Sequence, residues 1–322
     1  MKKNTLKKEL DWVSMLVPLA IVLTVCALFM IFPEGSKLVL SVVRGFLGDD
    51  FGLYYALLGV GIVGCTLYIA FSKFGKIKLG DCEKPQYRSF QWGTMIFTST
   101  MAADILFYSL CEWALYANES QVELMGGMQK WASTYPLFHW GPIAWGFYIV
   151  LAVAFGFMIH IRGRDKQKFS EACRPLLGSR VDGVLGRVID LTAIFALIAG
   201  TATTFSLATP LLSRAISHVF GLQDSIGLTI AILFDALTMV VSSYSYKRLK
   251  PEQEPDKRVR TFWAVVFILL PIALIFSENS MHSLQSVSII AAFPIGIIIL
   301  IIVASFFRDA SGYLQERKDT QA

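Results

Sequence analysis

Charged residues are scarce in this sequence, and the motifs of common soluble enzymes are absent. Charges make up 16% of the 322 residues, whereas soluble domains carry about a quarter. We find no Walker loop, no dinucleotide-binding fingerprint and no HExxH motif, which argues against an ATP-driven pump, a redox enzyme and a zinc protease. The sequence therefore predicts no enzymatic activity and no bound cofactor.

Cysteine is also rare, and its placement argues against structural zinc sites and disulfide bonds. The five cysteines are scattered along the chain: Cys26, Cys65, Cys82, Cys111 and Cys173. No two of them have metal-site spacing, so we expect neither a zinc site nor a disulfide framework. The net charge of +5 comes from basic loops, which suit anionic lipid headgroups, and we expect no nucleic-acid partner.

Long apolar stretches are what the sequence has in abundance. Apolar residues make up 55% of the chain, and the mean hydropathy is +0.57. Stretches long enough for a helix to cross a membrane lie at residues 12–32, 53–72, 92–117, 138–161, 187–213, 225–246, 260–277 and 286–307. They lack the alternation of barrel strands. The sequence thus predicts an all-α polytopic membrane protein with about eight transmembrane helices.

Basic residues alternate between the loops that join these stretches. They gather in the N-terminal segment and in the second, fourth and sixth loops, and are few elsewhere. Because Lys and Arg collect on the cytoplasmic side, we expect a multi-pass protein of the cytoplasmic (inner) membrane with both termini cytoplasmic. The first stretch lacks a small-x-small cleavage site, so we interpret it as a retained signal-anchor helix.

We expect residues 1–322 to form a single integral membrane domain. Residues 1–80 contain two plain apolar helices that look like scaffold, residues 90–246 contain chemically unusual core helices, and residues 257–310 contain two closing helices. The core helices are unusual because they carry Ser, Thr and Asp in apolar context.

One predicted core helix carries an acidic residue near its middle. Asp104 follows a run of hydroxyl residues that ends at Thr100. An unpaired carboxylate at this depth is costly, and intramembrane ionisable groups are usually functional. Asp104 therefore either acts on a ligand or ion, which we favour, or is satisfied by a neighbouring helix. We interpret Glu112, two turns further on, as a helix-end residue rather than a ligand.

The next predicted helix opens with a segment rich in aromatic residues, Phe138-His139-Trp140-Gly141-Pro142-Ile143-Ala144-Trp145. Indole faces attract quaternary ammonium groups with about 0.5–2 kcal/mol each, and we expect Trp140 and Trp145 to share one broad helix face. An interfacial aromatic belt is the alternative. The adjacent His139 and Gly-Pro step favour a shaped ligand site.

Two hydroxyl-rich runs lie in later helices, one over residues 200–206 and one over residues 242–245. Hydroxyls and freed carbonyls can bind Na⁺ where a membrane helix is broken, but they also join packed helices. Packing is the favoured explanation for most of them. Asp235, in the sixth stretch, has no obvious sequence partner.

Several motifs, in this order, resemble the betaine/carnitine/choline transporter family: Trp92–Glu112, Phe138–Gly141, Asp190–Pro210, Arg260–Trp263, Leu284–Val287 and Ala292–Pro294. The resemblance covers nearly the whole chain. The Phe-His-Trp-Gly-Pro motif and the Leu-Ala-Thr-Pro motif at 207–210 are most similar to the carnitine-exchanger branch. The resemblance implies secondary transport of quaternary ammonium compounds (choline, carnitine or glycine betaine), inverted repeats of the LeuT type and a homotrimer.

The resemblance also implies roles for particular residues. Trp140 and Trp145 match aromatic-box positions, and residues 100–104 match an unwound segment beside the substrate. The expected substrate-binding residues are Trp140, Trp145, Asp104, Met101 and Tyr108. The expected ion-coupling residues, for Na⁺ or H⁺, are Thr201, Thr204, Ser242 and Ser243.

Two departures from the family pattern qualify these implications. A carboxylate at Asp104, where the family has a small residue, favours a net cation such as choline over zwitterionic betaine, or else proton coupling. The chain is also much shorter than family members, and residues 225–246 begin like the sixth family helix and end like the tenth. An internal deletion would leave the LeuT-type arrangement partial. The alternative function is therefore a transport-incompetent paralogue or deletion product that acts at most as an assembly subunit.

Overall fold

The computed structural model describes the backbone of residues 9–80, 87–96, 102–132, 134–221, 238–248, 255–276 and 281–321. Within these ranges it does not describe the side chains of residues 95–96, 102–107, 109–110, 138, 201–212, 238–240, 268, 270–276, 281–285 and 321. All regular elements of the described chain are helices, and one isolated β-bridge joins Leu10 to Tyr246. The all-α prediction is confirmed for these residues.

The chain divides into two compact units: a large unit of residues 1–52 and 153–322, and a small unit of residues 53–152. The helices of the large unit are α2 (Trp12–Ile31), α3 (Pro33–Arg44), the π-helical η1 (Gly45–Asp50), α11 (Phe169–Ala172), α12 (Arg174–Leu177), the 3₁₀-helical η5 (Gly178–Asp182), α13 (Val184–Phe220), α15 (Thr238–Tyr244), α16 (Lys257–Phe276) and α17 (Met281–Gln321).

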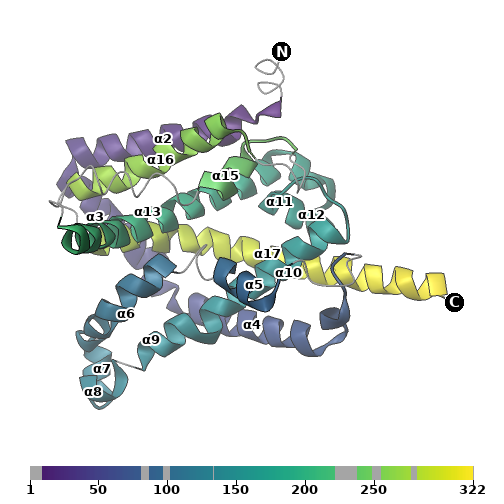
Figure 1. The fold of residues 1–322 in the computed structure, drawn as a ribbon, viewed down its shortest axis with the longest axis horizontal. Coiled ribbons are helices and arrows are strands. Elements are labelled where there is room, and N and C mark those ends of the chain that lie inside the picture. The colour runs from purple at the N-terminus through teal and green to yellow at the C-terminus, as the bar shows by residue number, and fades with distance from the viewer. Residues whose placement is uncertain are drawn as a thin grey trace. The chain divides into compact units, whose positions relative to one another are not determined.

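The apolar core of the large unit lies where α2, α13, α15 and α16 meet. Helix α2 packs along α16, and α13 packs against both α16 and α17 (Figure 1). Ile194, Trp263 and Val241 are fully buried there or nearly so. Helix α13 ends at Gly221, which has the left-handed conformation (φ 64°) that glycine adopts without steric cost.

The small unit holds α4 (Gly52–Phe71), η2 (Lys73–Lys76), α5 (Ser89–Ile96), α6 (Ala102–Ala117), α7 (Ser120–Leu124), α8 (Met128–Trp131), α9 (Tyr135–Phe138) and η4 (His139–Ile143); α10 (Ala144–His160) begins here and ends in the large unit. Small residues let α4 approach the start of α10 closely. Thr66 Oγ1 donates a hydrogen bond of 3.3 Å to the carbonyl of Gly146, and a Cβ added to Gly146 would lie 3.3 Å from Ile62.

Four stretches of the described chain are long and apolar enough to cross a membrane: Trp12–Ile31, Gly52–Phe71, Met128–His160 and Ser286–Thr320. A bent pair, Arg174–Asp182 and Val184–Gly200 at 107°, raises the number to as many as five. These agree with five of the predicted stretches. The predicted stretches at 92–117 and 225–246 run through residues outside the described ranges, and 260–277 corresponds to α16. The total of eight therefore stays a prediction.

Candidate functional site

A buried carboxylate joins two helical segments of the small unit. Glu112, on α6, is only 4% exposed. Its Oε1 lies 2.5 Å from Nδ1 of His139, and its Oε2 accepts a hydrogen bond of 2.6 Å from Nε1 of Trp140. An ionised Glu112 only accepts hydrogen bonds, and in that form it pairs with the Nδ1–H tautomer of His139. Burial of an ionised carboxylate is costly, and these two charge-assisted bonds offset that cost.

A break in the chain at Gly141 places His139 and Trp140 at this position. Helix α9 ends at Phe138, and Gly141 has the non-helical angles φ −88° and ψ −140°. Pro142 causes the break, because proline lacks an N–H and disfavours the helical conformation of the preceding residue. His139 and Trp140 consequently lie before the break, and α10 begins after it at Ala144.

Aromatic rings surround the Glu112 carboxylate. The ring of Tyr108, one turn earlier on α6, lies 5.9 Å from that of Trp140 and 6.4 Å from that of His139. The rings of His139 and Trp140 are 4.8 Å apart. The four-residue spacing puts Tyr108 and Glu112 on the same face of α6. We call Tyr108, Glu112, His139 and Trp140 the aromatic cluster.

Trp145 takes no part in this cluster. Its ring lies on α10 and contacts that of Tyr148 at 6.0 Å, and none of the ring contacts between described residues joins it to Trp140. The prediction that Trp140 and Trp145 share one helix face is wrong, because the break at Gly141 separates them. Of the predicted substrate-binding residues, the structure brings Trp140 together with Tyr108.

Two further predicted binding residues precede Tyr108 in the sequence. Asp104 lies in α6, one turn before Tyr108, but its side chain is outside the described residues; Met101 lies outside them entirely. The unwound segment implied for residues 100–104 is not seen over 102–104, which are α-helical. Residues 97–101 belong to the part of the chain that the structure does not describe.

The predicted ion-coupling residues lie in the large unit. Helix α13 is continuous through Thr201 and Thr204, whose side chains are outside the described residues. On α15, Ser242 is fully buried and Ser243 is partly buried. The neighbouring Ser245 accepts a buried hydrogen bond of 2.6 Å from Nε1 of Trp263, which is the packing role favoured for this run. Asp235 lies outside the described residues.

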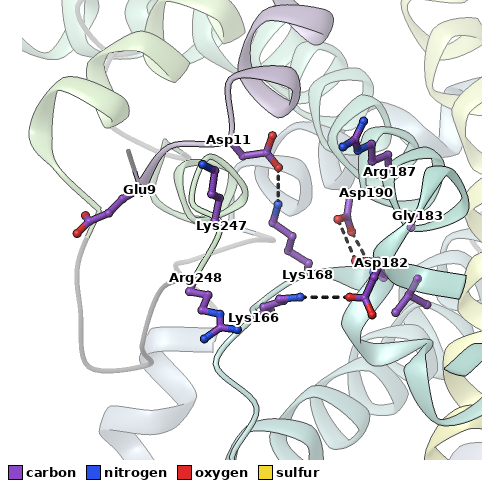
Figure 2. A pocket seen from close by; sticks show the side chains of 13 residues that line it. Glu9, Asp11, Lys166, Lys168, Asp182, Gly183, Arg187, Asp190, Lys247 and Arg248 are labelled. Atoms are coloured by element: carbon purple, nitrogen blue, oxygen red, sulfur yellow. Dashed lines mark hydrogen bonds and ion pairs between the residues drawn. The ribbon is translucent and has the colours of Figure 1, made fainter. Parts of the chain in front are cut away.

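The large unit also contains a charged pocket of about 540 Å³, shown in Figure 2. Several of its acidic and basic side chains pair with groups of the chain itself. Nζ of Lys168 donates to Oδ2 of Asp11 at 3.0 Å, and Asp190 accepts bonds of 2.9 Å from the N–H and the hydroxyl of Ser170. Lys166 donates to Asp182 at 3.4 Å. We interpret this pocket as a junction between chain segments.

The ion pair of this pocket shifts the acid–base behaviour of Asp11. Partial burial on its own raises the pKa of the Asp11 carboxyl, but the hydrogen bond and the positive charge of Lys168, with hydrogen bonds from Ser14, lower the pKa below its ordinary value. The carboxylate is therefore the favoured form of Asp11 at neutral pH.

Several of the basic segments that we expect on the cytoplasmic side contact one another in the large unit. Residues 9–11 form backbone hydrogen bonds with residues 245–247. Arg162, after α10, bonds to Asp309 and Glu316 of α17 at 2.8 and 2.9 Å. Residues 9–11, 162–168 and 245–247 and residues 309–316 of α17 therefore lie on the same side of the large unit.

Sequence reasoning missed Glu112, because the helix-end interpretation is wrong: the residue lies five positions before the end of α6 and is buried. Its spacing of four from both Tyr108 and Tyr116 was the available signal, since that pattern places the carboxyl between two rings on one helix face. The partners on His139 and Trp140 come from another segment. The described residues hold no group of three or more side chains that could bind a metal ion.

Comparison with known proteins places the chain in a family. The family model for the betaine/carnitine/choline family transporters (BCCT) matches residues 13–234 and 233–315. The chain is 29% identical over 221 residues to the glycine betaine transporter OpuD of Bacillus subtilis (strain 168), covering 67% of this chain and 43% of OpuD. It is 28% identical over 240 residues to a probable glycine betaine transporter of Desulfitobacterium hafniense (strain Y51), covering 74% and 48%.

The chain thus spans about half the length of these two relatives. The family consists of transporters, not enzymes, in keeping with the lack of catalytic motifs. Together with the apolar helices of the described chain, the match identifies a multi-pass protein of the cell membrane. The chain belongs to the betaine/carnitine/choline transporter family.

Proposed function

We propose that this chain binds quaternary ammonium compounds at the aromatic cluster and carries them across the cytoplasmic membrane as a secondary transporter. The observation that supports this most directly is the indole of Trp140, held beside Tyr108 by the buried Glu112. A quaternary ammonium group has no N–H to donate, so aromatic faces and nearby negative charge are the features that recognise it. Trp145, Asp104 and Met101 are the further substrate-binding residues that we propose.

Among these substrates we propose choline, or another net cation, ahead of carnitine and glycine betaine. Two acidic residues, Asp104 and Glu112, lie eight positions apart on α6, and Glu112 has aromatic neighbours. Betaine and carnitine carry their own carboxylates, which the like charge on these residues disfavours. The curated relatives are named for glycine betaine, so the order of preference is a property to be measured on this chain.

Transport against a gradient requires an energy source, and we propose Na⁺ or H⁺ coupling, or exchange. Thr201, Thr204, Ser242 and Ser243 are the proposed ion-coupling residues, because hydroxyls can ligate Na⁺. The burial of Ser242 is compatible with either this role or packing. We further propose both termini in the cytoplasm, on the side where the basic loops meet, a homotrimeric assembly and a partial LeuT-type arrangement.

A second candidate function is a shortened, transport-incompetent relative that acts at most as an assembly subunit. Two observations favour it: the chain spans about half of its relatives, and the family model matches in two pieces that meet at residues 233–234. The second observation also supports the proposed internal deletion within the sixth apolar stretch. Transport by this fold requires one inverted repeat to rock against the other, and a chain with such a deletion would be missing part of one repeat.

Uptake of labelled choline, carnitine and glycine betaine separates the two candidates. We would express the chain in cells without their own carriers, beside Trp140→Ala, Asp104→Gly and a Trp92→Ala control, since Trp92 is an exposed tryptophan of α5. Choline uptake that is lost in Trp140→Ala and retained in Trp92→Ala supports transport. Absence of all uptake by protein located in the membrane supports the second candidate.

A further inference from the structure

We propose that Glu112 is the positioning residue of the ammonium site: its buried carboxylate holds the indole of Trp140 so that the ring face stays available to a cationic headgroup. This inference rests on the proposed function and assigns Glu112 a role in the same site. Three features of the structure carry it: the direction of the hydrogen bond, the charge on its acceptor and the anchoring of that acceptor by His139.

The hydrogen bond restrains the ring without covering the part that binds cations. The indole Nε1–H lies at the ring edge and points along the ring plane, towards Oε2 of Glu112 at 2.6 Å. A tryptophan side chain turns about two bonds, and a short bond at its edge limits both rotations. Cations bind over the ring face. Trp140 is partly exposed, so a ligand and the Glu112 carboxylate need not compete.

The acceptor also contributes charge where the ligand needs it. Glu112 is 4% exposed, and water screens a buried charge poorly, so its attraction for a nearby cation is larger than it would be in solvent. A hydrogen bond to an anion further polarises the indole, as expected for linked hydrogen bonds. The carboxylate therefore acts both by fixing the ring and by favouring a positively charged occupant.

His139 fixes the direction of the carboxylate. It occupies Oε1 at 2.5 Å and so leaves Oε2 for Trp140. The His139 side chain is 51% exposed, whereas that of Glu112 is 5% exposed. Solvent therefore reaches His139 but scarcely reaches the carboxylate, which bonds to both residues of the pair before the Gly141 break and also interacts with Tyr116 of its own helix. We infer that His139 acts on the ligand through Glu112.

The first test requires no ligand. In the purified full chain labelled with ¹⁵N-tryptophan, the indole N–H resonance of Trp140 is identified by its absence in Trp140→Phe. We expect that resonance to move in Glu112→Gln and Glu112→Ala and to stay in place in Glu123→Gln, a control at an exposed glutamate of α7. A Trp140 resonance that is the same in wild type and Glu112→Ala would overturn the inference.

The second test measures binding of tetramethylammonium, a probe that consists of the headgroup alone. We expect Glu112→Ala to weaken its affinity roughly tenfold, the size of one charge-assisted hydrogen bond. Glu112→Gln keeps an acceptor oxygen and loses the charge, so it should weaken affinity less than Glu112→Ala. Because Trp140→Phe removes the N–H, Glu112→Ala should have a smaller effect in that background than in wild type.

The outcomes separate the inference from the proposed function. Wild-type binding that is unchanged in Glu112→Ala overturns the role of Glu112 and leaves the ammonium site standing. Full additivity of Glu112→Ala and Trp140→Phe overturns action through the indole N–H. Failure of the wild-type chain to bind either tetramethylammonium or choline overturns the proposed function, and with it the inference.

Discussion

Glu112 and Trp140 are 28 positions apart in the sequence, and a hydrogen bond of 2.6 Å joins the carboxylate of the first to the indole of the second. The bond links α6 to the segment just before the Gly141 break, which are parts of two different predicted membrane helices. Because of this bond, Trp140 is a fixed member of the aromatic cluster rather than a tryptophan that only anchors the chain at the membrane interface. The proposed ammonium site depends on this hydrogen bond.

Close packing of α4 against η4 predicts a strong difference between two glycines of the same helix. A Cβ on Gly59 would lie 3.3 Å from Ile143, whereas one on Gly61 would meet no atom within 4 Å. We expect Gly59→Val to destabilise the chain by about 1–3 kcal/mol through overpacking and Gly61→Val to change stability much less. Thermal unfolding in detergent measures both. Equal losses in the two variants would contradict the packing described.

The packing role of the second hydroxyl run predicts a cost for Ser245→Ala. This change leaves the N–H of the fully buried Trp263 without its partner at 2.6 Å, and an unpaired buried donor costs about 1–3 kcal/mol. The control is Thr261→Ala on α16, an exposed hydroxyl that bonds only to its own helix. A Ser245→Ala chain as stable as the control would speak against a structural role for this serine.

The Asp11–Lys168 pair predicts a pH-dependent contribution to stability. The folded pKa of Asp11 is lower than its ordinary value of 3.8, so its contribution is complete above about pH 4 and is lost as pH falls through the folded pKa. We expect wild type to be more stable than Asp11→Asn at pH 7 and the difference to shrink by pH 3. Unfolding temperatures at both pH values measure this. A difference independent of pH would refute the prediction.

The ion pairs of Arg162 are expected to keep the last turns of α17 ordered. Its guanidinium bonds to Asp309 and Glu316, which lie two turns apart on that helix. Removing it in Arg162→Ala should speed amide hydrogen exchange around Glu316 by about tenfold, because local opening then costs less. Lys318→Ala, at an exposed position of the same helix, serves as the control. Unchanged exchange in Arg162→Ala would show that these ion pairs do not hold the segment.

The helix positions could be predicted well where apolar length alone determines them. The predicted stretches at 12–32 and 53–72 differ from α2 and α4 by about one residue at each end, because membrane thickness sets the length of an apolar helix. The prediction of one continuous helix through Trp140 and Trp145 was wrong, although the helix break has a local cause in the sequence. Pro142 disfavours helix at Gly141, and a continuous helical face could not be assumed across it.

The aromatic cluster could be predicted only in part. Trp140 and Tyr108 are recognisable from residue type, since aromatic rings at membrane depth suit an ammonium ligand. Glu112 could not be paired with His139 and Trp140 from the sequence, because these two residues lie in another segment and helical spacing describes neighbours on one helix only. The same limit applies to Asp11 and Lys168, which are 157 positions apart.

Equilibrium binding of radiolabelled choline to the purified chain tests the central claim most directly. The comparison is wild type with Trp140→Ala and with Trp92→Ala, the exposed tryptophan of α5. We expect saturable binding by wild type and by Trp92→Ala, and a loss of at least about tenfold in affinity in Trp140→Ala. Absence of binding in wild type, or equal binding by Trp140→Ala, would contradict an ammonium site built on the aromatic cluster.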